Sequence, residues 1–324
     1  MCEVAVSVIC NTYNHGKYIA QTLDGFVMQK TSFPFEVLVH DDASTDDTAD
    51  IIRKYEKKYP DIIKPIYQTV NQYSQKVKIT PTYQFPRVKG RYIAYCEGDD
   101  FWTDPEKLQK QFDAMESHPE VDMCVHTTSK LYPDGKKVVV TACDTETIIP
   151  TEDIILGGGL SINTCSLMYR KSMLDVNWRF YDFMGYDYTL KIRGSLRGGL
   201  LCLPDNMGTY RFMSGPDSWT SRILKDNNKE IEHTKKRIQM LDYLDEDTDS
   251  KYADAICETK RKLEFNLLWY EDDYRSIKKP EFSDLYQKLS SKKKTMVKFG
   301  CVCPGLVKTF RHKVVNRYLK GYFR

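Results

Sequence analysis

The chain has 324 residues, enough for one large or two modest domains, and a formal net charge of +3. Apolar residues make up 41% and aromatic residues 12%, which supplies a hydrophobic core and excludes intrinsic disorder as the main state. No run of 18 or more apolar residues occurs, so we expect no conventional transmembrane helix. The N-terminus, MCEVAVSVICNTYN, lacks a basic leader, so we expect no cleaved secretory signal.

The first 125 residues alternate strand and helix patterns. The predicted strands are 4–10, 35–40, 62–67, 91–96 and 121–129. Helices are predicted over 17–29, from Ser44 or Thr45 onward, and from Pro105 onward with Asp104 as N-cap. Strands that alternate with helices favour a parallel sheet covered on both faces. We therefore predict an α/β fold with a mostly parallel sheet flanked by helices.

The pattern changes after about residue 130. Pro133-Asp134-Gly135 predicts a hairpin turn, and the glycines at 157–159 predict a flexible loop. Further elements follow in chain order: a strand at 166–172, a helix at 186–196, short strands at 200–203 and 208–213, and a polar helical region at 222–290. No repeat or low-complexity linker marks a sharp domain boundary.

Ten cysteines are scattered along the chain without a C-x-x-C pair. The closest pair is Cys301 and Cys303. We expect reduced thiols that act as small buried apolar groups, in preference to a disulfide framework or a zinc site. With no leader and reduced cysteines, we place the chain in the cytoplasm or peripherally on the inner face of the membrane.

Two acidic clusters follow predicted strands. Asp41-Asp42 ends the second strand, and Glu97-Gly98-Asp99-Asp100 follows the fourth. Ligands of open α/β sheets bind at the carboxyl ends of the strands. Carboxylates this close need a cation or raised pKa values, and Mg²⁺ or Mn²⁺ commonly uses one or two carboxylates together with substrate phosphates. The alternative is a solvated acidic turn before the next helix.

The first cluster also has a simpler interpretation. Asp41 to Asp47 has the composition of a turn with helix caps, and we expect Asp46 and Asp47 to be caps. Asp41 ends its strand, where its carboxylate can accept the imino N–H of a nucleobase.

Three segments, SVICNTYNHGKYIAQTL, FEVLVHDDASTDDT and GRYIAYCEGDDFWTDPEKLQKQ, resemble in sequence and order the family-2 glycosyltransferases, which have the Rossmann-like GT-A fold. The resemblance covers about 1–125 well and extends loosely to about 220. It implies a GT-A domain at 1–220, with a nucleotide-sugar half at 1–125 and an acceptor half at 126–220. A helical C-terminal region, 221–324, follows.

The resemblance also implies roles for residues. Asp99 contacts a Mn²⁺ or Mg²⁺ ion on the diphosphate, Glu97 takes the place of the usual first Asp of a D-x-D pair, and Asp41 holds uracil or a similar base. The residues implied to bind the nucleotide sugar are Thr12, Tyr13, Asn14, Asp41, Glu97, Gly98, Asp99 and Arg211. Those expected on the acceptor side are Asp100, Trp102, Thr164 and Ser166.

Members of this family are typically inverting and need a base for the acceptor hydroxyl. Asp187, in Gly185-Tyr186-Asp187, matches the place of that base, although an N-cap for the following helix is an alternative role. Arg211 is expected to face the diphosphate or to form a plain salt bridge, and Met213 stands where the family often has His. None of the six histidines has metal-ligand spacing, and we expect His15 and His40 to be packing or turn residues.

The C-terminal segment 292–324 carries ten Lys and Arg residues and no acid, interleaved with Phe, Val, Leu and Tyr. Basic amphipathic segments bind anionic membrane surfaces. The alternative is a solvated helix packed on the body of the protein. We expect no nucleic-acid partner, because no nucleic-acid-binding motif accompanies the charge.

The sequence thus predicts a metal-dependent inverting glycosyltransferase, a hexosyl- or N-acetylhexosaminyltransferase. It would use a nucleotide sugar, with UDP as the expected nucleotide, and a saccharide or lipid-linked saccharide acceptor in cell-surface polysaccharide synthesis. One alternative is a nucleotidyltransferase, although Asn11 to Lys17 has a single Gly where a glycine-rich phosphate loop is expected. The other is a non-catalytic carbohydrate- or membrane-binding protein on the same scaffold.

Overall fold

A computed structural model describes residues 3–157, 162–183, 187–215, 221, 226–303 and 305–307. The chain forms two compact units. The sheet unit comprises Met1–Ile154, Gly159–Val176 and Leu190–Phe212, and the helical unit comprises Ile155–Gly158, Asn177–Thr189 and Met213–Arg324. The main division therefore follows Phe212, and two short earlier segments join the helical unit.

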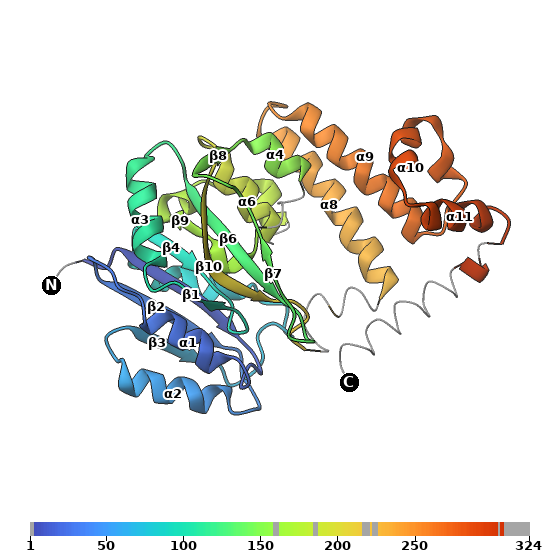
Figure 1. Cartoon of the computed structure of the whole chain (residues 1–324). Coiled ribbons are helices and arrows are strands. Elements are labelled where there is room, and N and C mark those ends of the chain that lie inside the picture. Colours follow the sequence, from blue (N-terminus) through green and yellow to red (C-terminus); the bar gives the residue numbers. More distant parts are fainter. Residues whose placement is uncertain are drawn as a thin grey trace. The chain divides into compact units, whose positions relative to one another are not determined.

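One mixed sheet organises the first unit, in the order β3-β2-β1-β4-β9-β6-β10-β5, with β7 on β6 and β8 on β10 (Figure 1). The pairs β1–β2, β2–β3, β1–β4 and β6–β10 are parallel, and the remaining pairs are antiparallel. The strands are β1 Val6–Thr12, β2 Phe35–Asp41, β3 Ile63–Tyr67, β4 Tyr92–Tyr95, β5 Phe101–Trp102, β6 Met123–Leu131, β7 Lys137–Val140, β8 Thr147–Ile149, β9 Met168–Arg170 and β10 Leu200–Arg211.

Helices flank this sheet and confirm the predicted α/β class. In Figure 1, α1 and α2 lie by the β1–β3 end of the sheet. The helices that contain residues of the sheet unit are α1 Ile19–Val27, α2 Thr48–Lys58, α3 Lys107–Ser117, α4 Thr151–Leu156 and α6 Asp187–Ser195, with short turns at η1 Thr80–Gln84, η2 Phe85–Arg87, η3 Thr164–Ser166 and η4 Lys171–Asp175. Helices α4 and α6 each continue across the division between the units.

The core of the sheet unit forms around β1, which is covered on both faces. Val6, Val8 and Cys10 are fully buried, as the near-continuous apolar sequence of a central parallel strand requires. Five cysteines are buried as free thiols, which agrees with their predicted role: Cys10, Cys96, Cys124, Cys165 and Cys202.

Two predicted helix starts differ from the structure. Helix α2 begins at Thr48 rather than near Ser44, because residues 42–47 form a polar loop in which the Asp46 carboxylate accepts from the Thr48 amide (3.0 Å). Helix α3 begins at Lys107 with Glu106 as N-cap, so the prediction of Asp104 as N-cap was wrong. The Asp104 carboxylate instead accepts from the backbone amide of the N-cap residue Glu106 (2.8 Å), two residues further along the chain.

The two short strands predicted at 200–203 and 208–213 form one strand, β10. Its pairing with β6 shifts register between Leu203 and Gly208, which explains the interruption in the hydrophobic pattern. The hairpin predicted at residues 133–135 joins β6 to β7, with the Gly135 amide donating to the Tyr132 carbonyl (2.9 Å).

The helical unit has its own apolar core. Its elements are α5 Arg179–Phe183, α8 Asn227–Asp247, α9 Ala253–Tyr270, η5 Ser276–Lys278, η6 Pro280–Phe282, α10 Ser283–Lys288 and α11 Ser291–Gly300. Phe265, Tyr274, Ile277 and Val297 form part of a buried cluster that joins α9 to α11. In the described part of the chain, we find no helix with the length and apolar content needed to span a membrane.

A fully buried lysine lies beneath the sheet edge. Lys107 Nζ lies 3.8 Å from the centre of the Trp102 ring and finds no hydrogen-bond partner among the described residues. The indole N–H of Trp102 donates to the Cys165 carbonyl (2.8 Å), so the ring itself is fixed. Burial lowers the pKa of Lys107 to about 7, because the charged ammonium loses its hydration.

We expect this lysine to make stability depend on pH. Between pH 7 and its ordinary pKa the unfolded chain binds the proton and the folded chain does not, so stability should rise with pH. The free energy of unfolding should increase by up to about 2 kcal/mol between pH 7 and 9 from this group. Lys107→Met should remove that increase in urea unfolding, whereas exposed Lys57→Met should keep it. Parallel pH profiles for wild type and Lys107→Met would contradict the prediction.

Candidate active site

Three neighbouring parallel strands end together at one edge of the sheet. Strand β1 lies between β2 and β4, and Thr12 at its end is paired with Asp41. The amide of Gly98 donates to the Asn11 carbonyl (2.9 Å), which holds the acidic turn, residues 97–100, against the end of β1. The two acidic clusters predicted from the sequence therefore meet at a single edge.

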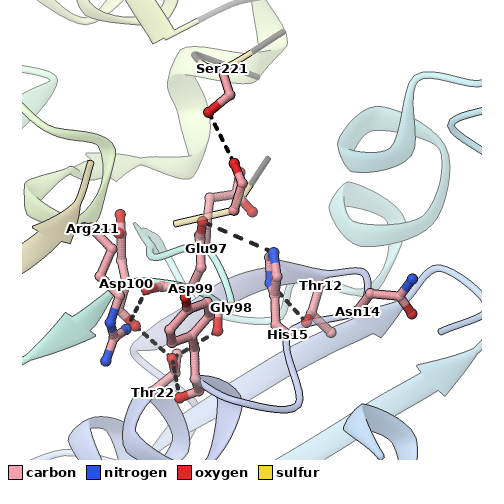
Figure 2. A network of polar contacts seen from close by, with 12 residues as sticks. Thr12, Asn14, His15, Thr22, Glu97, Gly98, Asp99, Asp100, Arg211 and Ser221 are labelled. Atoms are coloured by element: carbon pink, nitrogen blue, oxygen red, sulfur yellow. Dashed lines mark hydrogen bonds and ion pairs between the residues drawn. The ribbon is translucent and has the colours of Figure 1, made fainter. Parts of the chain in front are cut away.

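The acidic turn is fixed through its main chain (Figure 2). Thr22 Oγ1, on α1, lies within hydrogen-bond distance of the carbonyl oxygens of Gly98 (3.0 Å) and Asp100 (2.6 Å). A Cβ at Gly98 would come within 2.6 Å of Thr12 Oγ1, so this close approach requires glycine. The turn is therefore shaped by residues distant in sequence.

The buried side chain of Asp100 connects the acidic turn to β10. Its side chain is buried, and its Oδ1 accepts from the Arg211 backbone amide (2.8 Å). Burial and the neighbouring Asp99 charge raise the pKa of Asp100 well above its ordinary value. This arrangement ties the acidic turn to the end of β10.

Glu97 lies beside a second carboxylate, which disfavours its charged form. Burial, and then the Asp99 charge, raise its pKa to about 8, although hydrogen bonds from the Tyr95 hydroxyl and the Asn11 backbone favour the charged form. The Tyr95 hydroxyl is itself held by the Asn11 side-chain amide (2.7 Å). A divalent cation at this place would relieve the repulsion between the Glu97 and Asp99 carboxylates.

The carboxylates of the acidic turn fit a metal ion whose remaining ligands come from a substrate. In the described residues, no group of three or more His, Cys, Asp or Glu side chains is arranged to hold a metal ion. The Asp99 side chain remains about one-fifth exposed, with Glu97 beside it. Mg²⁺ characteristically combines one or two carboxylates with phosphate oxygens and water, so this site would be completed by a diphosphate.

Arg211 lies against the main chain of the turn. Its guanidinium donates to the Asp99 carbonyl and to Gln21 Oε1. It also lies over the rings of Tyr18 (4.7 Å) and Phe101 (4.5 Å). In this arrangement the cation supports the loop that carries Asp99, whereas the sequence suggested a diphosphate contact or a plain salt bridge.

Both carboxylates at the end of β2 are buried and hydrogen-bonded. Asp41 Oδ1 accepts from Ser44 Oγ (2.5 Å), and burial raises the pKa of Asp41 against the effect of this hydrogen bond. Asp42 accepts from the backbone amides of Gln72 (2.7 Å) and Tyr73 (3.0 Å) and so shapes the loop after β3. We predicted no separate role for Asp42, because its partners lie some 30 residues away in the sequence.

The first two motifs form one connected loop assembly. The Asn14 amide donates to Ser44 Oγ (2.9 Å), and Asn14 Oδ1 accepts from the Thr45 amide (2.7 Å). Asn14 has a φ of +54°, a left-handed conformation that Asn tolerates better than most residues. Tyr13 is 44% exposed beside this assembly, so its ring is available to a ligand.

A buried polar layer behind the site was not predicted. Gln84 Nε2 donates to the Leu38 carbonyl (2.9 Å) and lies 3.2 Å from Asn11 Oδ1. The Asn11 side-chain amide also donates to Thr80 Oγ1 (3.1 Å). These contacts anchor η1 beneath β1 and β2. His40, expected to be a packing residue, is buried and stacks on Tyr83 with a centroid distance of 5.2 Å.

The four acceptor-side candidates differ in how far their side chains are exposed. Trp102 is 2% exposed, and Asp100 is equally buried. Ser166 is fully buried and donates to the Asn163 carbonyl (2.7 Å). These three side chains belong to the core in this structure, and their acceptor-side role stays a prediction. Thr164, in η3, is partly exposed.

Asp187 is the first residue of α6, and its side chain is exposed. It belongs to the helical unit, where its charge opposes the lowering by burial of the His233 pKa. Gly185 and Tyr186, which complete the sequence motif, and the glycines at 158–159 lie outside the described residues.

Comparison with known proteins gives a consistent set of relatives. The sequence model of the family described as Glycosyl transferase family 2 matches residues 7–178. An uncharacterized protein of Mycobacterium tuberculosis is 35% identical over 215 residues, which cover 64% of this chain and 58% of the relative. An Escherichia coli UDP-Glc:alpha-D-GlcNAc-diphosphoundecaprenol beta-1,3-glucosyltransferase is 34% identical over 112 residues, covering 35% of this chain and 41% of that enzyme. The chain thus spans less than two thirds of either relative.

Solved structures confirm the GT-A fold. Residues 1–349 of Staphylococcus aureus TarS, in complex with UDP-GlcNAc, match with a TM-score of 0.58 at 16% identity, over 98% of this chain and 92% of that fragment. A Pyrobaculum calidifontis mannosyltransferase in complex with GDP-Man and Mn²⁺ matches with a TM-score of 0.53 at 13% identity, over 99% and 89% of the two chains. At such identities the likeness carries the fold alone.

Proposed function

Since the chain belongs to glycosyl transferase family 2, we propose that it moves a sugar, with inversion, from a nucleotide-diphosphate sugar to a hydroxyl of a saccharide or lipid-linked saccharide. The observation that carries this proposal is the meeting of Thr12, Asp41 and the acidic turn at one sheet edge. A nucleotide-sugar donor needs one carboxylate that binds the nucleobase and a second carboxylate that holds the metal ion on the diphosphate.

The donor is a UDP-sugar in this proposal. Asp41 accepts the imino N–H of uracil, and the exposed Tyr13 ring, with Thr12 and Asn14, lines the base. The Escherichia coli relative is named for UDP-Glc, and TarS is a fold relative in complex with UDP-GlcNAc. The donor of the Escherichia coli relative supports uridine as the nucleoside, with a hexose or N-acetylhexosamine as the transferred sugar.

Asp99 would hold Mn²⁺ or Mg²⁺ on the diphosphate, with Glu97 and the Gly98 backbone alongside. Such an ion, when bound, neutralises the charge that develops on the leaving nucleoside diphosphate. The raised pKa of Glu97 supports a cation at this place, and the mannosyltransferase fold relative is in complex with Mn²⁺. Arg211 and Thr22 act on the same step indirectly, because they fix the main chain that carries Asp99.

Asp187 is the general base in this proposal. Its exposed carboxylate at the start of α6 accepts the proton of the acceptor hydroxyl as that oxygen attacks the anomeric carbon in line with the departing phosphate. The bond from the anomeric carbon to the diphosphate oxygen breaks as the new glycosidic bond forms, which inverts the anomeric configuration.

The acceptor class follows from the relatives. The Escherichia coli enzyme is named for a diphosphoundecaprenol-linked acceptor, and a putative Bacillus subtilis relative is named for teichuronic acid biosynthesis. These names support our proposal of a role in cell-surface polysaccharide synthesis. Sugar transfer with release of the nucleotide distinguishes this proposal from the alternative, a non-catalytic carbohydrate-binding protein on the same scaffold.

Asp99→Ala should weaken the metal-dependent binding of UDP, because it removes the partly exposed carboxylate of the acidic turn. Calorimetric titration of UDP in the presence of Mn²⁺ measures the effect, and we expect at least about a tenfold loss of affinity for one lost ligand carboxylate. Asp61→Ala, an exposed acid outside the acidic turn, is the matched control. Unchanged UDP affinity in Asp99→Ala would remove Asp99 from the donor site.

Asp187→Asn should reduce turnover by about 10²–10⁴-fold, because an amide cannot take the hydroxyl proton. UDP affinity should stay at the wild-type value. Release of UDP from a UDP-sugar in the presence of acceptor measures turnover, and exposed Asp175→Asn serves as the control. A variant that turns over at the wild-type rate would exclude Asp187 as the base. Wild-type protein that binds UDP-sugars but never releases UDP would support the non-catalytic alternative.

We also propose that the basic segment 292–324 binds an anionic membrane surface. Helix α11 is anchored by buried Val297, so it packs on the helical unit. Nearby, Phe299 (52% exposed), Val302 (79%) and Leu306 (62%) remain exposed although they are apolar, and Lys298 is exposed among them. Apolar side chains beside basic ones suit the interface of an anionic bilayer.

Replacement of Phe299, Val302 and Leu306 together by Ser should reduce co-sedimentation of the full chain with phosphatidylglycerol-containing vesicles. Added salt should weaken the wild-type interaction, since about 1 kcal/mol per basic residue near the surface is electrostatic. Val139→Ser, which alters an exposed apolar residue of β7, should sediment like wild type. Equal sedimentation of the triple variant and wild type would contradict the membrane proposal.

A further inference from the structure

Ser44 joins the loops that follow β1 and β2. Its Oγ lies 2.9 Å from the Asn14 backbone nitrogen and 2.5 Å from Asp41 Oδ1. The Ser44 backbone amide also approaches the second oxygen of the same carboxylate, Asp41 Oδ2, at 3.4 Å. One residue therefore contacts both oxygens of the carboxylate that the proposed function places at the nucleobase.

The donor and acceptor roles in this chain of contacts are fixed. A backbone N–H can only donate, so the Ser44 hydroxyl accepts from Asn14 and keeps its own proton for another partner. An ionised carboxylate can only accept, so that proton goes to Asp41 Oδ1. The hydroxyl thus has one orientation, in which it restricts the rotation of the Asp41 carboxylate.

The backbone on either side of Ser44 holds the hydroxyl in place. Ala43 has a φ of +61°, a left-handed conformation that is unfavourable for residues other than Gly. It lies where the chain turns back and brings Ser44 against Asp41. On the other side of Ser44, the Thr45 amide donates to Asn14 Oδ1 (2.7 Å). A hydroxyl held in this way is suited to orient a neighbouring carboxylate.

Ser44 also favours the charged form of Asp41. Burial raises the pKa of Asp41, and the hydrogen bonds from the Ser44 side chain and backbone lower it in opposition. The neighbouring His40 lowers this pKa further, and Asp46 raises it. Because Asp41 is 2% exposed, a small rotation or the uptake of a proton changes which ring nitrogen its carboxyl group can bind.

We propose that Ser44 is a positioning residue that orients the Asp41 carboxylate to accept from the N3–H of uracil, and that it thereby selects uridine over cytidine diphosphates. This inference rests on the proposed function, in which Asp41 binds the base. Uracil N3 carries a hydrogen, whereas cytosine N3 carries a lone pair that a fixed, ionised carboxylate repels. A site built around one hydrogen bond discriminates strongly against a ligand that lacks the matching group.

Calorimetric titration of the full chain with UDP and with CDP, each in the presence of Mn²⁺, tests this role without turnover. Wild type should bind UDP at least about tenfold more tightly than CDP, as expected for one hydrogen bond to a charged group. Ser44→Ala should bring the ratio of the two affinities close to one, mainly by weakening UDP binding. Ser44→Thr keeps the hydroxyl and should restore the ratio. Ser32→Ala, at an exposed serine before the other end of β2, is the matched control and should leave the ratio unchanged.

Inorganic pyrophosphate with Mn²⁺ separates the base contact from the diphosphate contact. Pyrophosphate has no base, so Ser44→Ala should bind it as tightly as wild type does. A merely structural role for Ser44 predicts instead that UDP, CDP and pyrophosphate all weaken by the same factor, and that result would overturn the proposal. Ser44→Cys, whose thiol is a weaker donor, should give an intermediate ratio and serves even if Ser44→Ala does not fold.

The outcomes separate this inference from the proposed function. If Asp41→Asn loses the preference for UDP and Ser44→Ala keeps it, the positioning role is wrong and the base contact of Asp41 stands. If Ser44→Thr has as low a ratio as Ser44→Ala, the hydroxyl is not what orients Asp41, and the inference also fails. If wild type binds UDP no more tightly than CDP, both the base contact of Asp41 and the role of Ser44 are wrong.

Discussion

The parallel pairing of β2, β1 and β4 is the constraint on which the site depends. Because parallel strands all end at the same edge, the residues after each strand are brought together whatever their separation in sequence. Thr12, Asp41 and the acidic turn thereby become neighbours although they lie tens of residues apart. A slip of one residue in any of these pairings would turn the side chains to the opposite face.

This convergence places several carboxylates where water is scarce. Local hydrogen bonds offset part of the free energy lost when these charged groups leave water. The Arg211 amide reaches Asp100, Ser44 reaches Asp41, and Thr22 fixes the turn through its carbonyl oxygens. Burial nevertheless raises the pKa of Glu97 to about 8. Functional sites commonly retain such unrelieved strain, because a well-placed substrate or cation removes it only on binding.

In the proposed function, the helical unit has a different role from the sheet unit. Its buried cluster around Tyr274 and Val297 holds α11, and the apolar side chains that this packing leaves exposed lie near lysines. In this view the sheet unit handles the donor while the C-terminal segment addresses the surface where a lipid-linked acceptor is found. The family match covers residues 7–178 and therefore bears on the sheet unit and not on the C-terminal segment.

The sequence by itself determined the α/β class, the strands of the N-terminal half and the two acidic clusters, because these depend on local periodicity and on composition at strand ends. Only the tertiary structure decided which polar side chains face the site. Trp102 and Ser166 are buried, and Arg211 lies under the acidic turn, 112 residues from the Asp99 carbonyl that it contacts. Ser44 likewise acquires the Asn14 amide as a donor only when β1 and β2 pair. Such partners are set by packing across the sheet, which no local pattern of residues records.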